Sequence, residues 1–254
     1  MNTIKTKIKN GIAICQFVNT HYSNPFSISR MRELTVELSE LNENHNVKSV
    51  VLYGGDGNSF CVGGDFNEVS KFTGGDEVDE WIDVISDLYV GILSLTKPII
   101  ASVDKYCIGI GFQVAICCDI RIASEDAIFE MPELKKGISC VFGGLMLEDF
   151  FDRAAMLDML YYEHCLDAER ARNLSLVSEV VEGRSLDSSE VYAERIRDYP
   201  SVAILKTKPV INAQFIETVE TARRTAKKAH RASFKDGSAQ EEMKTIISPS
   251  VRTA

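Results

Sequence analysis

The sequence predicts an α/β fold in which a parallel sheet is covered by crossover helices. Segments with strand-like and helix-like patterns alternate through the first half of the chain, which is typical of parallel strands joined by helices. From about Phe142 helical patterns dominate, and one apolar segment, LSLVSEVVEG at residues 174–183, interrupts them. Because no repeat or low-complexity linker divides the chain, we expect a core over residues 1–195 that continues into a helical region over residues 196–254.

The chain opens with a predicted β-hairpin. Asn10 and Gly11 separate two runs in which polar and apolar residues alternate, and this dipeptide suits a two-residue turn with positive φ at both positions. A helix is expected next, over about residues 27–44, with Ser27 or Ser29 as its N-cap. Its apolar residues recur at helical spacing and are Ile28, Met31, Leu34, Val36, Leu38 and Leu41. The apolar run VKSVVLYG then predicts a buried strand over residues 47–54.

A strongly amphipathic helix is expected over residues 76–95, and Pro98 keeps it from running on. Its apolar face consists of Val78, Trp81, Ile82, Ile85, Leu88, Tyr89 and Ile92. The segment PIIASVD, residues 98–104, predicts a second buried strand. A turn and a short apolar helix follow in YCIGIGFQVAICCD, and IRIAS and AIFEMPEL predict further strands. The last helix is expected from about Pro209 to Phe234.

Composition argues against several classes of protein. The chain has 28 basic and 37 acidic side chains, and its net charge of −9 does not suit non-specific binding of nucleic acid. The seven cysteines show no metal-ligand spacing, so we expect no metal site. The N-terminus lacks the apolar stretch of a secretory signal, and no apolar run reaches the roughly 20 residues that cross a bilayer. We therefore expect a cytoplasmic protein with free thiols and no membrane partner.

The stretch SFCVGGDFNEV, residues 59–69, places Gly63 and Gly64 after a predicted strand. The pair could form a simple turn, a phosphate cradle or a set of exposed backbone amides. The spacing fits neither G-x-G-x-x-G nor a P-loop, which argues against the phosphate cradle. A second glycine turn, IGIGF at residues 108–112, also follows a buried strand and opens a helix. Because the first amides of a helix lack an intrahelical partner, the two turns together can form an oxyanion hole.

These motifs, together with MPELKKGI at residues 131–138, resemble the crotonase (enoyl-CoA hydratase/isomerase) superfamily over essentially the whole chain. The resemblance implies a crotonase (ClpP-like) spiral of β-β-α units with a C-terminal helical trimerisation region. It implies an oxyanion hole built from the amides of Gly64 and Ile110. It also implies that coenzyme A enters as a thioester substrate with no permanently bound cofactor, and that the protein is a homotrimer or a dimer of trimers.

The hydratases of this family place one glutamate after the second turn and another in the Pro-Glu motif. Here the first position is Gln113 and the second is Glu133. A carboxamide cannot act as a general base, so simple hydration should be lost or severely weakened. Glu133 is the candidate catalytic carboxylate.

Three further segments narrow the resemblance: NPFS at residues 24–27, EWIDVISDLY at 80–89 and NAQFIETVETARRTAKKAHRASF at 212–234. They are similar to the branch of the family that forms carboxymethylproline in carbapenem biosynthesis. That branch implies decarboxylation of malonyl-CoA to an enolate, attack on the imine of pyrroline-5-carboxylate and hydrolysis of the thioester. It also implies contacts from Trp81, Gln113 and His230 to the cyclic imine. Decarboxylation makes an enolate without a base, and a single carboxylate then suffices for hydrolysis.

Alternatives remain at this point. The same fold serves enoyl-CoA hydratases, isomerases and acyl-CoA hydrolases of general metabolism, and the basic last helix could bind RNA, as some crotonases do. The segment CVFGGLMLEDFF, residues 140–151, departs from the pattern of this branch. A different acyl-CoA or a different cyclic imine therefore remains open as the substrate. The cations that could bind the coenzyme A phosphates are Lys135, Lys136, Arg223, Arg224, Lys227 and Lys228.

Overall fold

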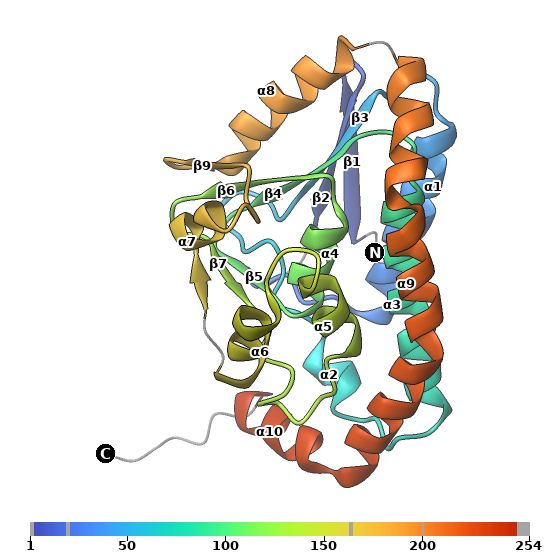
Figure 1. Ribbon diagram of the computed structural model, residues 1–254, viewed down its shortest axis with the longest axis vertical. Coiled ribbons are helices and arrows are strands. Elements are labelled where there is room, and N and C mark those ends of the chain that lie inside the picture. The colour runs from blue at the N-terminus through green and yellow to red at the C-terminus, as the bar shows by residue number, and fades with distance from the viewer. Residues whose placement is uncertain (1–2, 19–20, 163–164, 200, 248–254) are drawn as a thin grey trace.

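Figure 1 shows a computed structural model of the chain, which describes residues 3–18, 21–162, 165–199 and 201–247. The described strands form two sheets. The larger sheet has the order β1 (Ile4–Lys9), β2 (Ile12–Phe17), β3 (Ser49–Tyr53), β4 (Ile99–Val103), β6 (Ile120–Ser124) and β9 (Glu179–Val181). The smaller sheet has the order β5 (Tyr106–Ile108), β7 (Ile128–Glu130) and β8 (Leu166–Asp167).

The pairing within the larger sheet confirms the predicted α/β class. The β1–β2 pair is antiparallel, while β3, β4, β6 and β9 follow β2 in parallel register. Asn10 and Gly11 join β1 to β2 with φ values of 51° and 81°, so the predicted hairpin turn is confirmed. All residues of β3 and β4 are buried, as expected for central strands of a parallel sheet.

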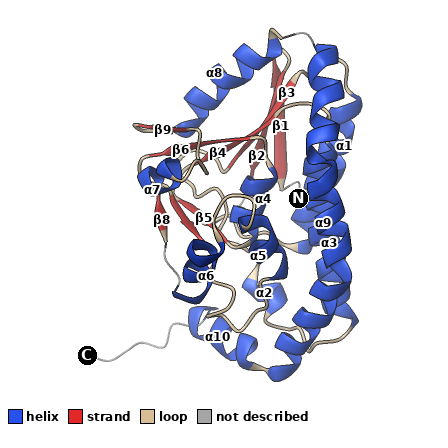
Figure 2. Cartoon of the chain, viewed as in Figure 1, coloured by secondary structure: helices blue, strands red, loops and turns tan. Residues whose placement is uncertain are grey.

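Helices cover both faces of this sheet (Figure 2). They are α1 (Ile28–Glu43), α2 (Phe66–Val69), α3 (Asp76–Ser94), α4 (Ile110–Cys117), α5 (Val141–Leu147), α6 (Arg153–Tyr162), α7 (Ala168–Asn173), α8 (Ser185–Arg197), α9 (Ser201–Asp236) and α10 (Ser238–Ile247). A small apolar cluster lies between α8 and the sheet, whereas the main core lies among the remaining helices and both sheets. Within the described residues, no helix has both the length and the apolar character needed to cross a membrane.

The last long helix differs from the sequence prediction. It begins at Ser201, well before the predicted start at Pro209, and Pro209 lies inside it. Proline lacks the N–H that would bond the carbonyl four residues earlier, at Leu205. The preceding residue, Lys208, anchors this part of the helix, because its Nζ donates to Lys97 O and to Asp119 Oδ2, each at 2.8 Å. Tertiary contacts therefore override the local signal of the proline.

Other differences are smaller. The side chain of Val36, expected on the apolar face of α1, is 58% exposed. The helix α10 and the strand β8 had no clear signal in the sequence, because both are short and depend on packing against other segments. The boundary predicted at residue 195 falls in the last turn of α8, and the division into two regions stays a prediction.

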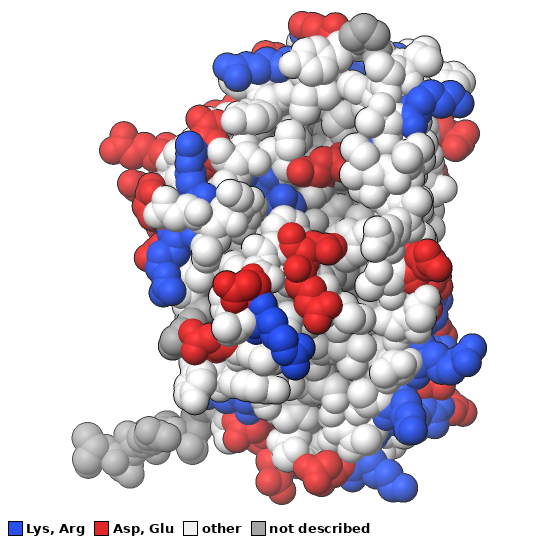
Figure 3. Space-filling view, in the orientation of Figure 1, with Lys and Arg blue, Asp and Glu red and all other residues white. Residues whose placement is uncertain are grey.

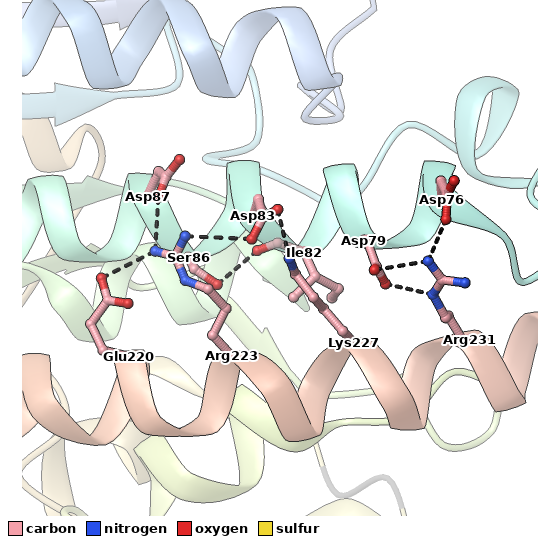
Figure 4. Close-up of polar contacts among 10 residues, drawn as sticks. All are labelled: Asp76, Asp79, Ile82, Asp83, Ser86, Asp87, Glu220, Arg223, Lys227 and Arg231. Carbon is pink, nitrogen blue, oxygen red and sulfur yellow. Dashed lines mark hydrogen bonds and ion pairs between the residues drawn. The ribbon is translucent and has the colours of Figure 1, made fainter.

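A ladder of ion pairs joins α9 to α3 along one side of the molecule (Figure 4). Arg231 binds Asp76 at 2.6 Å and Asp79 at 2.7 Å. Lys227 binds Asp83 at 2.7 Å, and Arg223 binds Asp87 at 2.8 Å. Each exposed pair contributes little on its own, but together the pairs link α9 to α3 at several points along their length. Arg223, Lys227 and Arg231 of α9 therefore form ion pairs within the protein.

Gly111 in α4 should not tolerate a side chain. A Cβ atom there would lie 2.5 Å from the carbonyl oxygen of Cys61, a fully buried residue. We expect Gly111→Ala to destabilise the protein by about 1–3 kcal/mol, measured from urea denaturation. Gly91→Ala in α3 is the matched control, because a Cβ there would contact only the side chain of Thr35 at 3.5 Å. Equal effects of the two changes would contradict the packing argument.

Candidate active site

The candidate site residues predicted from the sequence line one cavity of about 60 Å³. Residues that line it come from α2, α3, α4, α5 and α9, which Figure 1 labels, and from the loop that follows β7. Different parts of the chain contribute the candidate residues, which are Gly64, Trp81, Ile110, Gln113, Glu133 and His230. The fold therefore brings them together, while their individual roles stay predictions.

The two glycine turns leave backbone donors at the cavity. Phe26 and Gly64 form an isolated β-bridge, in which Phe26 N donates to Gly63 O at 2.8 Å and Asp65 N donates to Phe26 O at 3.0 Å. The N–H of Gly64 takes no part in these two hydrogen bonds. Ile110 is the first residue of α4, where an amide has no intrahelical acceptor. Within the described part of the chain, neither N–H donates a hydrogen bond.

The turns also lie close to each other. A Cβ atom on Gly64 would contact Ile110 Cδ1 at 3.5 Å. Gly63 and Gly109 have φ values of 100° and 55°, a region that glycine enters easily and other residues avoid. A Cβ on Gly109 would lie 3.2 Å from Glu133 Oε1, so the absence of a side chain keeps space open beside the carboxylate. The geometry suits stabilisation of a developing oxyanion.

Glu133 has a carboxyl group enclosed by protein. Its Oε1 accepts a hydrogen bond from Gln113 Nε2 at 2.7 Å, and its Oε2 is buried without a hydrogen-bond partner of regular geometry among the described residues. Burial raises the pKa of Glu133 to about 7, although its own backbone amide, the Cys140 thiol and Gln113 favour the charged form. A carboxyl group with this pKa can accept a proton near neutral pH.

Gln113 is held from both sides. Its Nε2 donates to Glu133 Oε1, and its Oε1 accepts a hydrogen bond from the hydroxyl of Tyr89 at 2.7 Å. Nε2 also lies 3.5 Å from Met131 Sδ. The N–H of the amide is therefore directed at Glu133, and the contact from Gln113 to the cyclic imine stays a prediction.

Trp81 and His230 form one wall of the cavity. Their rings meet edge to face with centroids 5.7 Å apart, and both residues are buried. His230 Nδ1 bonds the carbonyl oxygen of Ala226 at 2.7 Å, and burial lowers the pKa of His230, so the ring is neutral at pH 7. Trp81 Nε1 is buried and has no acceptor among the described residues. This N–H can donate to a polar group of a bound molecule.

The basic candidates for the phosphates of coenzyme A lie in three kinds of place. Arg223 and Lys227 face α3 and belong to the ion-pair ladder (Figure 4). Lys135, Arg224 and Lys228 are exposed. Lys136 lines the cavity itself. Acidic and basic side chains are interspersed over the face drawn in Figure 3, which gives no support there to a nucleic-acid surface.

Taken together, unpaired amides and a single carboxyl group of near-neutral pKa define a site that stabilises an oxyanion and moves a proton. The enoyl-CoA hydratase/isomerase family model matches residues 7–247, and the chain belongs to this family of acyl-CoA enzymes. The carboxymethylproline synthase of Pectobacterium carotovorum subsp. carotovorum is 39% identical over 225 residues, covering 88% of this chain and 90% of that protein.

Solved structures agree with this assignment. ThnE from S. clavuligerus has 40% sequence identity and a TM-score of 0.78, covering 89% of this chain and 100% of its own. The enoyl-CoA hydratase from Bacillus halodurans has a TM-score of 0.88 at 20% identity, covering 96% of this chain and 99% of its own. The latter similarity shows the fold alone. The predicted crotonase fold, with its C-terminal helical region, is confirmed.

The structure adds two residues that the sequence did not single out. Tyr89 could be recognised only as part of the apolar face of its helix, yet its hydroxyl contacts the site through Gln113. Cys140 lines the cavity near Glu133, and burial raises the pKa of its thiol well above the usual value. No spacing motif marks either residue, because both reach the site through tertiary packing.

Proposed function

We propose that the protein decarboxylates malonyl-CoA to a thioester enolate, adds this enolate to pyrroline-5-carboxylate and hydrolyses the thioester to release carboxymethylproline. The observation that carries the proposal is the pairing of Gln113 with Glu133 beside unpaired amides. A site with one carboxylate suits a reaction whose first step needs no base. The 39% identity to a carboxymethylproline synthase supports the same reaction.

In the first step, the thioester oxygen would accept hydrogen bonds from the amides of Gly64 and Ile110. Loss of carbon dioxide leaves its bonding electrons on the enolate, and the negative charge collects on this oxygen. The enolate carbon would then attack the imine carbon of the acceptor, the electrons of the C=N π bond would move to the nitrogen, and the nitrogen would take a proton from water. The unpaired indole N–H of Trp81 would bind the acceptor carboxylate next to His230.

In the last step, Glu133 would act as a general base. Its unpaired Oε2 would take a proton from a water molecule, and the resulting hydroxyl would attack the thioester carbonyl. The same amides would hold the oxyanion of the tetrahedral intermediate, which collapses by breaking the C–S bond. The departing thiolate of coenzyme A would take the proton from Glu133, which returns the base to its ionised form. Lys136 is the cation of the cavity lining that we propose for a phosphate of coenzyme A.

Incubation with malonyl-CoA and pyrroline-5-carboxylate, followed by mass spectrometry, tests the proposal. Carboxymethylproline and free coenzyme A are the expected products, and malonyl-CoA alone should give acetyl-CoA. Detection of neither acetyl-CoA nor carboxymethylproline would refute the proposal. Crotonyl-CoA is the matched substrate control, because its hydration at ordinary enzyme rates would instead indicate a hydratase.

Hydrolysis of the thioester should depend on pH. Because the pKa of Glu133 is raised to about 7, the ionised base is scarce below this pH and predominates above it. We expect the hydrolysis rate of carboxymethylproline thioester to rise through about pH 7 and then level off, whereas decarboxylation should show no inflection from this group. Release of coenzyme A measured across this range checks the prediction, and an inflection near the ordinary glutamate value of about 4.3 would contradict it.

We also propose that the chain forms a homotrimer or a dimer of trimers. Apolar side chains on the first half of α9 support an interface there, since Val202, Val210 and Ile211 are 69%, 76% and 71% exposed. Sedimentation equilibrium tests this part, and a monomer would contradict it.

A further inference from the structure

A chain of hydrogen bonds leads from α3 to the candidate base. Tyr89 is fully buried in α3, and its hydroxyl donates to Gln113 Oε1 at 2.7 Å. Gln113 Nε2 in α4 donates in turn to Glu133 Oε1 at 2.7 Å. The ring of Tyr89 packs edge to face on Phe142, with centroids 5.8 Å apart. The hydroxyl is therefore held in place independently of the amide.

The orientation of the Gln113 amide matters for the charge on Glu133. An ionised carboxylate can only accept hydrogen bonds, so it needs the NH₂ end of the amide. A flipped amide would present its oxygen to Glu133, an arrangement that becomes favourable only when the carboxyl group is protonated. Space around the amide is tight, because a Cβ on Gly143 would lie 3.2 Å from Gln113 Nε2. The amide oxygen accepts a hydrogen bond from Tyr89, so this hydroxyl can decide which end of the amide faces Glu133.

We propose that Tyr89 is a positioning residue whose hydroxyl fixes the Gln113 carboxamide with its N–H directed at Glu133, which keeps the base ionised. The inference rests on the proposed function of Glu133 as the base of thioester hydrolysis. Tyr89 acts through Gln113. Burial raises the pKa of Tyr89 well above its usual value, so the hydroxyl remains a donor over the working pH range.

Other ionisable groups surround this chain. Glu130 and Cys140 lie near Glu133. Cys61, Cys117 and Cys140 lie near Tyr89. Lys136 and His230 line the same cavity. Burial keeps the cysteines as neutral thiols and His230 neutral at pH 7. None of these groups contacts the Gln113 amide oxygen in place of Tyr89.

Tyr89→Phe tests the inference, because it removes the hydroxyl and keeps the ring. The midpoint for ionisation of Glu133 should move upward by about one pH unit, since a buried amide oxygen loses its donor. Infrared titration can follow the carboxyl band that Glu133→Gln removes, and it needs no substrate. The pH profile of hydrolysis should move by the same amount. A midpoint that stays at the wild-type pH in Tyr89→Phe would overturn the inference.

Tyr53→Phe is the matched control, because the hydroxyl of Tyr53 is also bonded within the protein, to Asp56 Oδ1 at 2.7 Å, but lies outside the cavity. This change should leave the titration of Glu133 unaltered. Absence of turnover with malonyl-CoA would count against the proposed function, while the infrared midpoint would still decide the role of Tyr89.

Gln113→Met keeps the inference falsifiable if Tyr89→Phe folds poorly, because an unchanged ionisation midpoint of Glu133 in this single variant would already overturn it. Gln113→Met removes the amide and should itself raise the ionisation midpoint of Glu133. If Tyr89 acts through Gln113, adding Tyr89→Phe to Gln113→Met should move the midpoint no further. An unchanged midpoint in Gln113→Met, or an additive shift in the double variant, would overturn the inference.

Discussion

Glu133→Gln should spare the decarboxylation of malonyl-CoA and slow thioester hydrolysis by about 10²–10⁴-fold. The carboxamide has nearly the same shape and can still accept the hydrogen bond from Gln113, but it cannot take a proton from water. Decarboxylation needs no proton acceptor, so the enolate should still form and add to the imine. The carboxymethylproline thioester should therefore accumulate, and mass spectrometry of the quenched reaction can detect it.

Glu130→Gln is the matched control for this prediction. Glu130 lies on β7 close to Glu133, but it is outside the cavity lining. Its replacement should leave hydrolysis near the wild-type rate, with at most a small electrostatic effect on Glu133. Glu133→Ala should likewise spare decarboxylation and slow hydrolysis, and it leaves no carboxamide in the cavity. Equal loss of decarboxylation and hydrolysis in Glu133→Gln would contradict the separate role assigned to the carboxylate.

The site joins two kinds of chemical group with different structural origins. The oxyanion donors are backbone amides, so they depend on the conformation of the glycine turns rather than on side-chain identity. The proton acceptor is one side chain whose pKa depends on burial and on neighbours from several elements. Gln113 therefore adds no proton acceptor to the site and leaves the oxyanion donors intact.

Local patterns predicted much of the fold because the relevant signals act over a few residues. Three of these predictions required no knowledge of distant contacts: the Asn10-Gly11 turn, a serine N-cap for α1 and the period of the apolar residues in α3. The sequence left Ser27 and Ser29 open as the cap, and the structure has Ser27. The glycine turns around Gly64 and Ile110 were likewise visible in the sequence. The sequence allowed the two turns to converge and the family resemblance implied it. Residues of both turns line one cavity, while their role as oxyanion donors stays a prediction.

Other features depend on contacts between distant segments and left no local signal. The helix α9 begins at Ser201 and continues through Pro209, and the contact that stabilises this part is the hydrogen bond from Lys208 Nζ to Asp119 Oδ2. The ladder between α3 and α9 could not be separated from a solvent-exposed charged face by sequence alone. The contact of Tyr89 with Gln113 was hidden for a related reason, since a buried tyrosine on an apolar helix face serves packing in most proteins.

Ile110→Pro should reduce decarboxylation by about 10²–10³-fold, because proline removes the backbone N–H that we assign to the oxyanion hole. The first position of a helix accepts proline well, and the N–H of Ile110 has no acceptor among the described residues, so α4 should still form. Circular dichroism can check that the fold is kept. Acetyl-CoA formation from malonyl-CoA measures the step without involving Glu133.

Ile110→Val is the control for this change, because it keeps the amide and most of the buried side chain. Its decarboxylation rate should remain close to that of the unmodified protein. Ile110→Pro should also slow hydrolysis, since the tetrahedral intermediate uses the same donors, whereas Glu133→Gln should slow hydrolysis alone. Decarboxylation by Ile110→Pro at the rate of Ile110→Val would show that the enolate oxygen is stabilised elsewhere, and the assignment of the paired glycine turns would then be wrong.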